Sequence, residues 1–274
     1  MAQKWTEEQI RIIHDHGFTD EEKSRLIHRS IACIRTKRLR LKPSRMIRRY
    51  SVTNGRLRRD FFNRWSRDSS YIAGFTCADG YFFRKGNGVG WSLHPIDACL
   101  LKRFKSVLRS GLPIRRYKYG KSPCARLEIS DKELSFGLRK MGVSKILKTQ
   151  RQRFPKVPTM MMSHFIRGVF DGDGGFCFRK TNRCRTMELL GEFTGNHRFI
   201  TGLRRALISC LGRRLPKVKK IKNKNASRLS LRGKDAVDLG DLMYRRKGIF
   251  LNRKKKKWEK GKAYYKARWA HTSR

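Results

Sequence analysis

The sequence predicts an α+β protein: two tandem αββαββα subdomains that form a pseudo-two-fold core, preceded by a small three-helix helix-turn-helix domain. Three observations predict this arrangement. A motif rich in glycine and aspartate occurs twice, the segments after its two copies share one order of elements, and the N-terminal region carries three helix-start signals. Internal repetition of this kind implies similar structural units within one chain.

The first domain is expected over residues 1–43. Each of its helices should begin with a hydroxyl side chain that accepts a bond from a free backbone N–H, and in two cases a later Glu or Gln can return the bond. Pro43 ends the run, because proline cannot continue a helix. The expected caps are Thr6 with Gln9, Thr19 with Glu22, and Ser30.

The third helix, IACIRTKRLRL, carries basic residues around an apolar stripe. Arg35, Lys37 and Arg38 are expected to contact DNA, because the last helix of a helix-turn-helix unit enters the major groove. The stretch from Trp5 to Leu41 also resembles Myb/SANT-like modules, which start with a tryptophan and end on a basic helix. It has only one of their spaced tryptophans, and a generic helical bundle with a solvated basic face is the alternative.

The net charge indicates a polyanionic partner. The chain holds 68 Lys and Arg against 21 Asp and Glu, a formal charge of +47 that is spread along its length. Such a chain repels itself until a polyanion neutralises it, so nucleic acid is the expected partner. Residues 44–60 are basic and contain an Asn-Gly turn, and we expect a linker that follows phosphates. A ribosome-associated or chromatin-like protein is the alternative that charge alone leaves open.

Cysteine usage and the N-terminus indicate a location inside the cell. The seven cysteines are scattered, without a C-x-x-C pair, and are expected to be reduced thiols. The start MAQKWTEEQ has no apolar signal-peptide region, and SSYIAGFTCADGYFF is too short to span a bilayer. We therefore expect a cytoplasmic or nucleoid protein that is neither secreted nor held in a membrane.

Two segments share one pattern: YIAGFTCADGYFF at 71–83 and FIRGVFDGDGGFCF at 165–178. Asp79 matches Asp173 at an offset of 94 residues, 173 minus 79. After each copy the expected order is hairpin, helix, hairpin, helix. The predicted boundaries are 61–154 for the first subdomain, 155–260 for the second, and 261–274 for a basic C-terminal tail.

These segments resemble the paired motifs of the LAGLIDADG homing endonucleases, in the single-chain form that carries both motifs. The flanks FFNRWSRDSSYIAGF and RFPKVPTMMMSHFIRGVFDGDG are also similar to that family. The resemblance implies a site-specific double-strand DNA homing endonuclease, acting as a monomer on a long, imperfectly palindromic site. A mobile element of a phage or bacterium is the implied setting. A non-cleaving DNA-binding regulator and an RNA-splicing maturase on the same fold remain alternatives.

Each motif is expected to be a helix that ends at its Asp-Gly pair. Small residues at the helix contact, Ala73, Gly74 and Gly168, would let the two helices approach closely. Side-by-side packing would then bring both helix C-termini together, and with them the last aspartate of each motif.

The two aspartates predict a metal site. Carboxylates that meet at helix C-termini are disfavoured as anions, and a divalent cation removes that cost. We expect Mg²⁺ or Mn²⁺, held by Asp79 and Asp173 together with the backbone of Gly80 and Gly174. Metal held there can activate water and stabilise the attacking and leaving oxygens of a phosphodiester, one on each DNA strand.

The earlier aspartate of the second motif, Asp171, is expected to be structural. A calcium loop that starts there would need an acid or Asn at position five and Glu at position twelve. Those positions hold Gly175 and Asn182, so this alternative fails. The first motif departs from the family pattern by carrying Cys77 at the equivalent place; the resemblance implies that this position is not the metal ligand, so little loss is expected.

Basic residues outside the motifs are expected to assist. The family uses a lysine late in each repeat, and the resemblance implies catalytic roles for Lys148 and Lys254, although neighbouring lysines could serve instead. His94 is a weaker candidate for a polar residue near the site. Basic and apolar side chains alternate in the hairpins, as in a sheet with one buried face. The hairpin residues expected on DNA are Lys85, Arg116, Lys118, Arg126, Arg179, Lys219 and Arg228.

Overall fold

The computed structural model describes residues 5–14, 19–41, 56–83, 86–119, 122–143, 152–180 and 187–272, and the chain divides into two units, Met1–Gly55 and Arg56–Arg274. The division falls inside the segment 44–60. Lys85 and Lys148 lie outside the described residues, so the roles predicted for them stay predictions.

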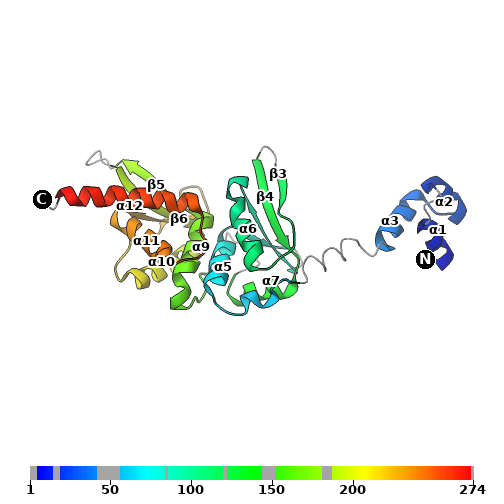
Figure 1. Cartoon of the computed structure of the whole chain (residues 1–274), viewed down its shortest axis with the longest axis horizontal. Coiled ribbons are helices and arrows are strands. Elements are labelled where there is room, and N and C mark those ends of the chain that lie inside the picture. The colour runs from blue at the N-terminus through cyan, green and yellow to red at the C-terminus, as the bar shows by residue number, and fades with distance from the viewer. Residues whose placement is uncertain are drawn as a thin grey trace. The chain divides into compact units, whose positions relative to one another are not determined.

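Three helices form the described part of the N-terminal unit: α1 (Glu7–His14), α2 (Asp20–Ile27) and α3 (Ile31–Leu41) (Figure 1). Three buried isoleucines, Ile13, Ile27 and Ile34, form their small core. Because this core is so small, the helix caps matter for the stability of the unit.

All three predicted caps of this unit are confirmed. The Thr19 hydroxyl accepts the backbone N–H of Glu22 at 3.2 Å, and the Glu22 carboxylate accepts the backbone N–H of Thr19 at 2.7 Å. Thr6 and Gln9 make the same pair of bonds, and the Ser30 hydroxyl accepts the backbone N–H of Cys33. Each bond satisfies a donor that the first turn of a helix leaves without a partner.

The second unit contains two consecutive copies of one αββαββα arrangement, which confirms the predicted α+β core of two subdomains (Figure 1). The first copy consists of η1 (Arg59–Phe62), α5 (Arg67–Asp79), β1 (Gly80–Phe82), β2 (Val89–Leu93), η2 (Pro95–Asp97), α6 (Ala98–Val107), β3 (Arg115–Tyr119), β4 (Ser122–Ile129) and α7 (Lys132–Lys140). The second consists of η3 (Thr159–Met161), α9 (Met162–Asp173), β5 (Gly174–Lys180), β6 (Met187–Gly195), α10 (His197–Leu211), β7 (Lys219–Lys220), β8 (Ser227–Arg232) and α11 (Lys234–Tyr244), followed by α12 (Asn252–Thr272).

Each copy holds one antiparallel four-stranded sheet. The strand orders are β1-β2-β4-β3 and β5-β6-β8-β7, which are equivalent in the two copies. The registers are equivalent as well, since Gly80 pairs with Trp91 and Gly174 pairs with Phe193. The sheets therefore begin at the same point relative to the two motif helices, α5 and α9.

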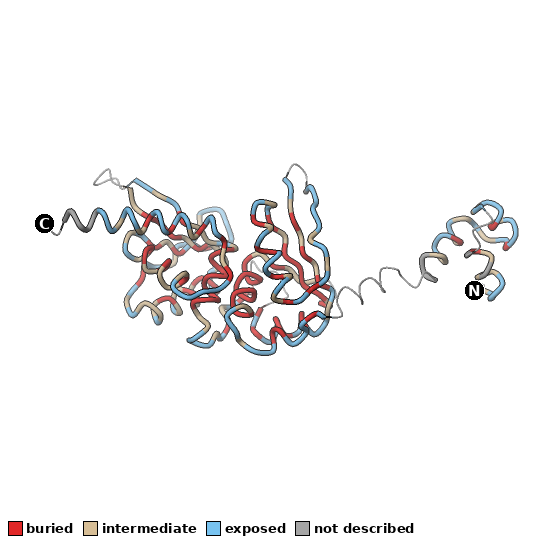
Figure 2. Tube along the Cα trace, in the orientation of Figure 1, coloured by how far each residue is buried: buried red, intermediate tan, exposed pale blue. Residues whose placement is uncertain are grey.

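Buried and more exposed residues alternate along the strands, so each sheet has one buried face. Ala125, Leu127 and Ile129 of β4 are fully buried, and Leu229 and Leu231 of β8 are buried in the same way. Figure 2 shows both motif helices buried along most of their length, and the apolar residues of both copies form one continuous core. The other side of each sheet, termed the open face below, carries the intervening polar residues.

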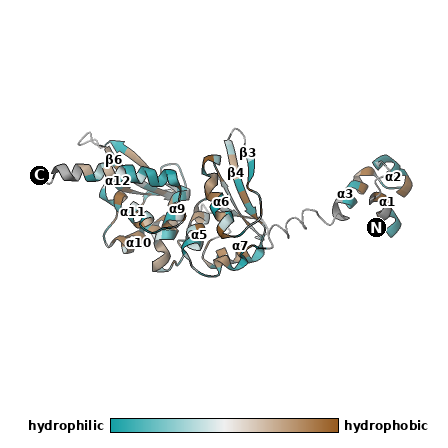
Figure 3. Cartoon of the chain, in the orientation of Figure 1, coloured by the Kyte–Doolittle hydropathy of each residue, from teal (hydrophilic) through white to brown (hydrophobic). Residues whose placement is uncertain are grey.

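The last helix, α12, packs on the second copy although its surface is hydrophilic (Figure 3). Trp258 anchors it: the ring is buried, and its Nε1–H donates to the carbonyl of Val237. Arg253 forms a two-pronged ion pair with Asp97 of η2, and Lys262 is bonded to Asp241 of α11. The helix continues past residue 261, where the basic tail was predicted to start.

Two further expectations concern cysteines and membranes. Six cysteines lie among the described residues, and each of them is a free thiol. None of the helices that the structure describes combines the length and the apolar character needed to cross a bilayer.

Candidate active site and nucleic-acid interface

The two motif helices touch backbone to backbone. A Cβ atom added to Gly74 would overlap the carbonyl oxygen of Phe165, and one added to Gly168 would overlap the carbonyl oxygen of Tyr71. Ala73, the third small residue predicted at the contact, is fully buried. Glycine is needed here because no side chain fits between the helices, and the dihedral angles play no part.

The contact continues to the helix ends. A Cβ atom on Gly172 would overlap the methyl group of Ala78 and would lie 3.5 Å from the backbone nitrogen of Asp79. Asp79 and Asp173 are the last residues of α5 and α9, so the structure brings the ends that carry them side by side, as the sequence predicted. The pair Ala78 and Gly172 was missed, although the repeat offset matches these two residues.

The chemistry of this donor set fits a divalent cation shared with a substrate. Asp79 and Asp173 supply two carboxylates at helix C-termini, and the described residues contain no group of three or more His, Cys, Asp or Glu that could hold a metal by itself. Mg²⁺ typically uses one or two carboxylates together with phosphate oxygens and water. Such a pair is therefore suited to a cation that the substrate helps to bind.

Asp171 is buried, and its hydrogen bonds connect parts of the protein to one another. Its Oδ2 accepts the hydroxyl of Tyr71 at 2.7 Å and the backbone N–H of Leu251 at 2.8 Å, while its Oδ1 is buried without a partner in the described structure. Burial raises the pKa of Asp171 to about 6, and the bond from Tyr71 acts in the opposite direction. The carboxylate joins the two motif helices to the segment that precedes α12.

Lys254 lies beneath the end of α9. Its side chain is buried, and its Nζ donates to the carbonyl oxygens of Phe170 at 2.8 Å, Asp171 at 2.6 Å and Gly174 at 2.7 Å. Phe170 and Asp171 belong to the last turn of α9, where a helix leaves carbonyls without intrahelical partners, and Gly174 is the first residue of β5. Burial lowers the pKa of Lys254 to about 8, and the Asp171 carboxylate opposes that shift.

These contacts bear on two predicted roles. The ammonium of Lys254 is engaged by main-chain carbonyls and holds the end of the helix that carries Asp173, which supports positioning more than direct contact with a substrate. The carbonyl of Gly174, predicted as a metal ligand, already accepts a bond from Lys254. His94 caps η2 by accepting the backbone N–H of Ile96, so its side chain has a structural use.

A second buried polar group lies along α9, one to two turns before Asp171. Arg167 is fully buried and donates to the carbonyls of Met243 and Arg246, and its Nη2 lies 2.8 Å from Nδ1 of His164. Burial, aided by the charge of Arg167, lowers the pKa of His164 to about 4. The sequence reasoning missed this group; the arginine within the apolar motif FIRGVF was the available signal.

The open face of the first sheet carries an arginine that packs against two tyrosine rings. Arg126 lies over the rings of Tyr81 and Tyr117, at 5.8 and 5.0 Å from their centroids. Directly opposite residues of an antiparallel pair share a face, and Arg126 is opposite Arg115. Arg115 and Tyr117 therefore share the open face with it.

The residues predicted to contact DNA from β3, Arg116 and Lys118, lie one residue out of phase with the open face. They pair with Ala125 and Pro123, and Ala125 points into the core, so both side chains leave β3 on the helix-covered side. A strand alternates with period two, and a shift of one residue moves every side chain to the other face. Arg115 and Tyr117, in place of Arg116 and Lys118, project from β3 onto the open face.

The open face of the second sheet is strongly basic and grooved. The register places Arg179 opposite Glu188, and Lys219 opposite Arg228, on the face that also carries Glu192. The three basic residues predicted to bind DNA from this sheet line one groove of about 520 Å³, together with Lys217, Lys220 and Arg232. The structure brings together what the sequence predicted there.

The basic residues of α3 are partly engaged within the N-terminal unit. Arg38 donates to Asp20 at 2.5 Å and to the carbonyl of Ile13 at 3.0 Å, so it ties α3 to the other two helices. Arg35 also pairs with Asp20, yet its side chain is 63% exposed, and Lys37 lies over the ring of Trp5. Both arginines hold the pKa of Asp20 below its ordinary value.

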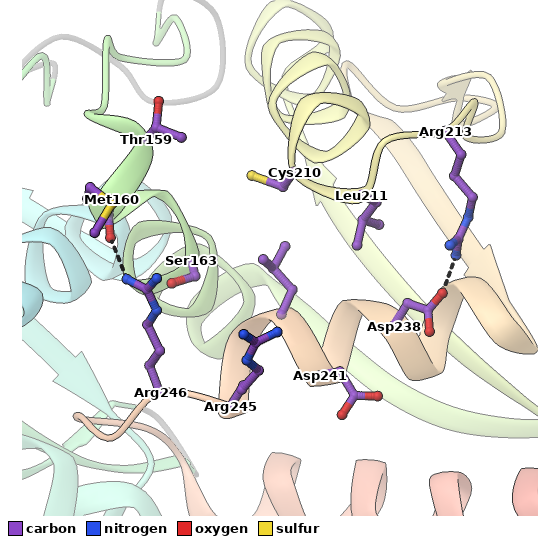
Figure 4. A pocket seen from close by; sticks show the side chains of 11 residues that line it. Thr159, Met160, Ser163, Cys210, Leu211, Arg213, Asp238, Asp241, Arg245 and Arg246 are labelled. Atoms are coloured by element: carbon purple, nitrogen blue, oxygen red, sulfur yellow. Dashed lines mark hydrogen bonds and ion pairs between the residues drawn. The ribbon is translucent and has the colours of Figure 1, made fainter.

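Another cavity, of about 400 Å³, lies between η3, the start of α9, the end of α10 and α11 (Figure 4). Several of its charged residues have partners: Arg213 pairs with Asp238, Arg246 donates to the carbonyl of Met160, and Asp241 pairs with Lys262. It includes neither motif aspartate and no residue of the open faces, so it is separate from the candidate site.

Comparison with known proteins defines the class of fold. No family model and no curated protein matches the chain. Among solved structures, it is similar to the LAGLIDADG meganuclease I-AabMI bound to uncleaved DNA, with a TM-score of 0.51 and 12% identity over 74% of this chain and 91% of the other. It is also similar to I-SmaMI bound to an uncleaved DNA target in the presence of calcium ions, with a TM-score of 0.52 and 15% identity over 76% and 93%.

A second I-SmaMI structure, bound to uncleaveable DNA with a TTGT central four, gives the same TM-score of 0.52 and 15% identity, over 76% of this chain and 91% of the other. The chain thus has the fold of the LAGLIDADG meganucleases, as its doubled motif predicted. At these identities the likeness defines the fold, and the activity depends on the residues of the site.

Proposed function

We propose that the protein is a site-specific double-strand DNA endonuclease of the homing type. One observation carries the proposal: two glycine-packed motif helices end side by side on Asp79 and Asp173, and a sheet with a basic open face begins directly after each aspartate. Two acids, one from each half of the chain, suit one cut in each strand.

The two aspartates would hold the divalent cation, Mg²⁺ or Mn²⁺, that this chemistry requires. When bound, the metal supplies charge stabilisation for the attacking and leaving oxygens and acidifies water. The protein's own contribution is positioning: Gly74 and Gly168 set the helix spacing, and Lys254 holds the end of α9. Lys148 is proposed to assist on the other half.

The open faces would lie in the major grooves on either side of the cut. A two-stranded ribbon fits the major groove, and each base pair presents a distinct pattern of donors and acceptors there. Two similar but unequal sheets predict a long, imperfectly palindromic site read by a monomer. The N-terminal unit would add contacts through Arg35 and Lys37, with Arg38 serving mainly its own fold.

The test is cleavage of a randomised duplex library with Mg²⁺ by the whole chain, compared with Asp79→Asn and Asp173→Asn. Each variant should keep DNA binding and lose cutting of one or both strands. Tight binding without any cutting by the unaltered protein would identify a DNA-binding regulator instead. Binding of structured RNA in preference to duplex DNA would indicate a maturase.

A further inference from the structure

Each sheet carries one acidic residue in the same row of its open face. In the first sheet the row consists of Tyr81, Gly90 and Glu128, directly beside the pair that Gly80 makes with Trp91. In the second sheet the equivalent row, beside the pair of Gly174 with Phe193, consists of Gly175, Glu192 and Ser230. The acid stands on β4 in one sheet and on β6 in the other.

Different residues build the same arrangement in both rows. The hydroxyl of Tyr81 donates to Oε1 of Glu128 at 2.7 Å, and the hydroxyl of Ser230 donates to Oε1 of Glu192 at 2.6 Å. In each case the hydroxyl belongs to another residue of the same row and fixes one oxygen of the carboxylate. The other oxygen, Oε2, makes no hydrogen bond within the described structure, and the side chains are 32% and 26% exposed.

An arginine forms an ion pair with each acid, at a distance longer than a hydrogen bond. Nη1 of Arg126 lies 3.6 Å from Oε1 of Glu128, and Nη1 of Arg228 lies 3.7 Å from Oε1 of Glu192. Both distances exceed a hydrogen bond. The hydroxyls therefore orient the carboxylates, and the guanidinium groups keep N–H donors for another partner.

A fixed carboxylate is out of place on a surface that only binds phosphates, because the two anions repel. It is useful where it meets a hydrogen-bond donor. In the major groove those donors are the amino groups of cytosine N4 and adenine N6, and glutamate accepts from cytosine. The arginine beside it suits O6 and N7 of guanine, so acid and base together match the two members of a C·G pair.

We propose that Glu128 and Glu192 determine sequence specificity by accepting a hydrogen bond from a base amino group, cytosine before adenine, one in each half of the target. This rests on the proposed function. Because the two rows are equivalent, the two base pairs read should lie at nearly the same distance from the centre of the site. Strands are about 4.8 Å apart and base pairs 3.4 Å, so the distances should agree within about two base pairs.

The experiment is selection of bound duplexes from a randomised library, without cleavage, followed by sequencing. The proteins are the unaltered chain, Glu128→Gln and Glu192→Gln, with Glu133→Gln as the matched control. Glu133 is an exposed acid on α7, so its loss changes the net charge equally without touching an open face. Tyr81→Phe and Ser230→Ala test the orienting hydroxyls, and thermal melting confirms that each variant is folded.

The proposal expects each Gln variant to lose discrimination at one base pair by roughly 5- to 150-fold, in opposite halves of the site. The hydroxyl variants should relax the same position to a smaller extent, and Glu133→Gln should leave the profile unchanged. Unchanged profiles for both Gln variants would overturn the proposal while leaving the endonuclease function standing. A uniform change in affinity at every position would also overturn it. An unaltered chain that selects no sequence would instead count against the proposed function itself.

Discussion

The hydroxyl of Tyr71 donates a 2.7 Å hydrogen bond to the buried carboxylate of Asp171, and so links the two motif helices across their contact. Leu251 adds a backbone N–H to the same oxygen. This bond is a polar tie between α5 and α9, within a contact where glycines bring the two backbones together.

Tyr71→Phe should destabilise the protein by about 1–3 kcal/mol, because it leaves a buried carboxylate with one donor fewer. Chemical denaturation measures this, with Tyr81→Phe as the control, since the acid that Tyr81 bonds, Glu128, is partly exposed. A double-mutant cycle with Asp171→Asn should show coupling between the two positions. Additive effects would contradict the assigned bond.

Gly168→Ala should cost about 3 kcal/mol or more, because the new methyl group meets backbone atoms that cannot yield. Gly175→Ala is the matched control: it lies two residues beyond Asp173, and a Cβ there has nothing within 4 Å. Its effect should stay within about 1 kcal/mol. Equal unfolding midpoints for the two variants would show that the helices are not held at backbone distance.

Lys254→Met should destabilise the protein by about 2–4 kcal/mol, since the carbonyls at the end of α9 lose their donor and Asp171 loses a nearby positive charge. DNA cleavage should fall as well, through misplacement of Asp173. The pH–rate profile separates the two possible roles. A lysine that exchanged a proton during cleavage would produce an inflection near pH 8 that the variant lacks, whereas a positioning lysine would not.

Because of His164, the free energy of unfolding should decrease in acid. Burial lowers its pKa in the folded protein from 6.5 to about 4, so the unfolded chain binds the proton more readily between these values. Stability should therefore fall as the pH drops from about 6.5 to about 4, by roughly 3 kcal/mol from this group. In His164→Asn, whose Oδ1 can replace Nδ1 as acceptor for Arg167, this part of the pH dependence should disappear from the unfolding free energy.

DNA affinity should fall steeply with salt, because lysines and arginines release counterions when they bind phosphates. Lys219→Gln, in the groove of the second sheet, should weaken binding at all sequences and reduce the slope of log K against log salt by about one. Lys132→Gln on α7 removes the same charge away from the open faces and should leave the slope unchanged. Salt-independent binding of the unaltered chain would refute the electrostatic basis of the proposed interface.

The repeat in the sequence was enough to predict the fold and the pairing of Asp79 with Asp173. The offset between equivalent residues is constant wherever the two halves are alike, and both motif helices end at the predicted aspartates. The N-terminal caps were predictable for a different reason: a hydroxyl followed by Glu or Gln three residues later is a purely local signal.

The face of β3 was not predictable. The strand RRYKY has no apolar alternation, and the residues 115–118 are all exposed, so only pairing with the alternating strand β4 shows which side each residue takes. Arg116 differs from Arg115 by one residue in register, and this shift places its side chain on the opposite face of the sheet.

The position of Lys254 was predictable in part. Four consecutive lysines, 254 to 257, offered no basis for choice by themselves. Trp258 lies one helical turn after Lys254, and both are buried, so the phase of the helix relative to its one tryptophan in that stretch would have selected the buried lysine. Its contacts with the end of α9 depend on tertiary packing and could not be read from the chain.

The link between Tyr71 and Asp171 also decides which half can pair with which. The repeat offset places Phe165 where the first motif has Tyr71, and Cys77 where the second has Asp171. Two copies of the second half would set a buried carboxylate against phenylalanine, and two copies of the first would set tyrosine against cysteine. A homodimer of either half would therefore lack the hydrogen bond between Tyr71 and Asp171, so this tie requires one copy of each half.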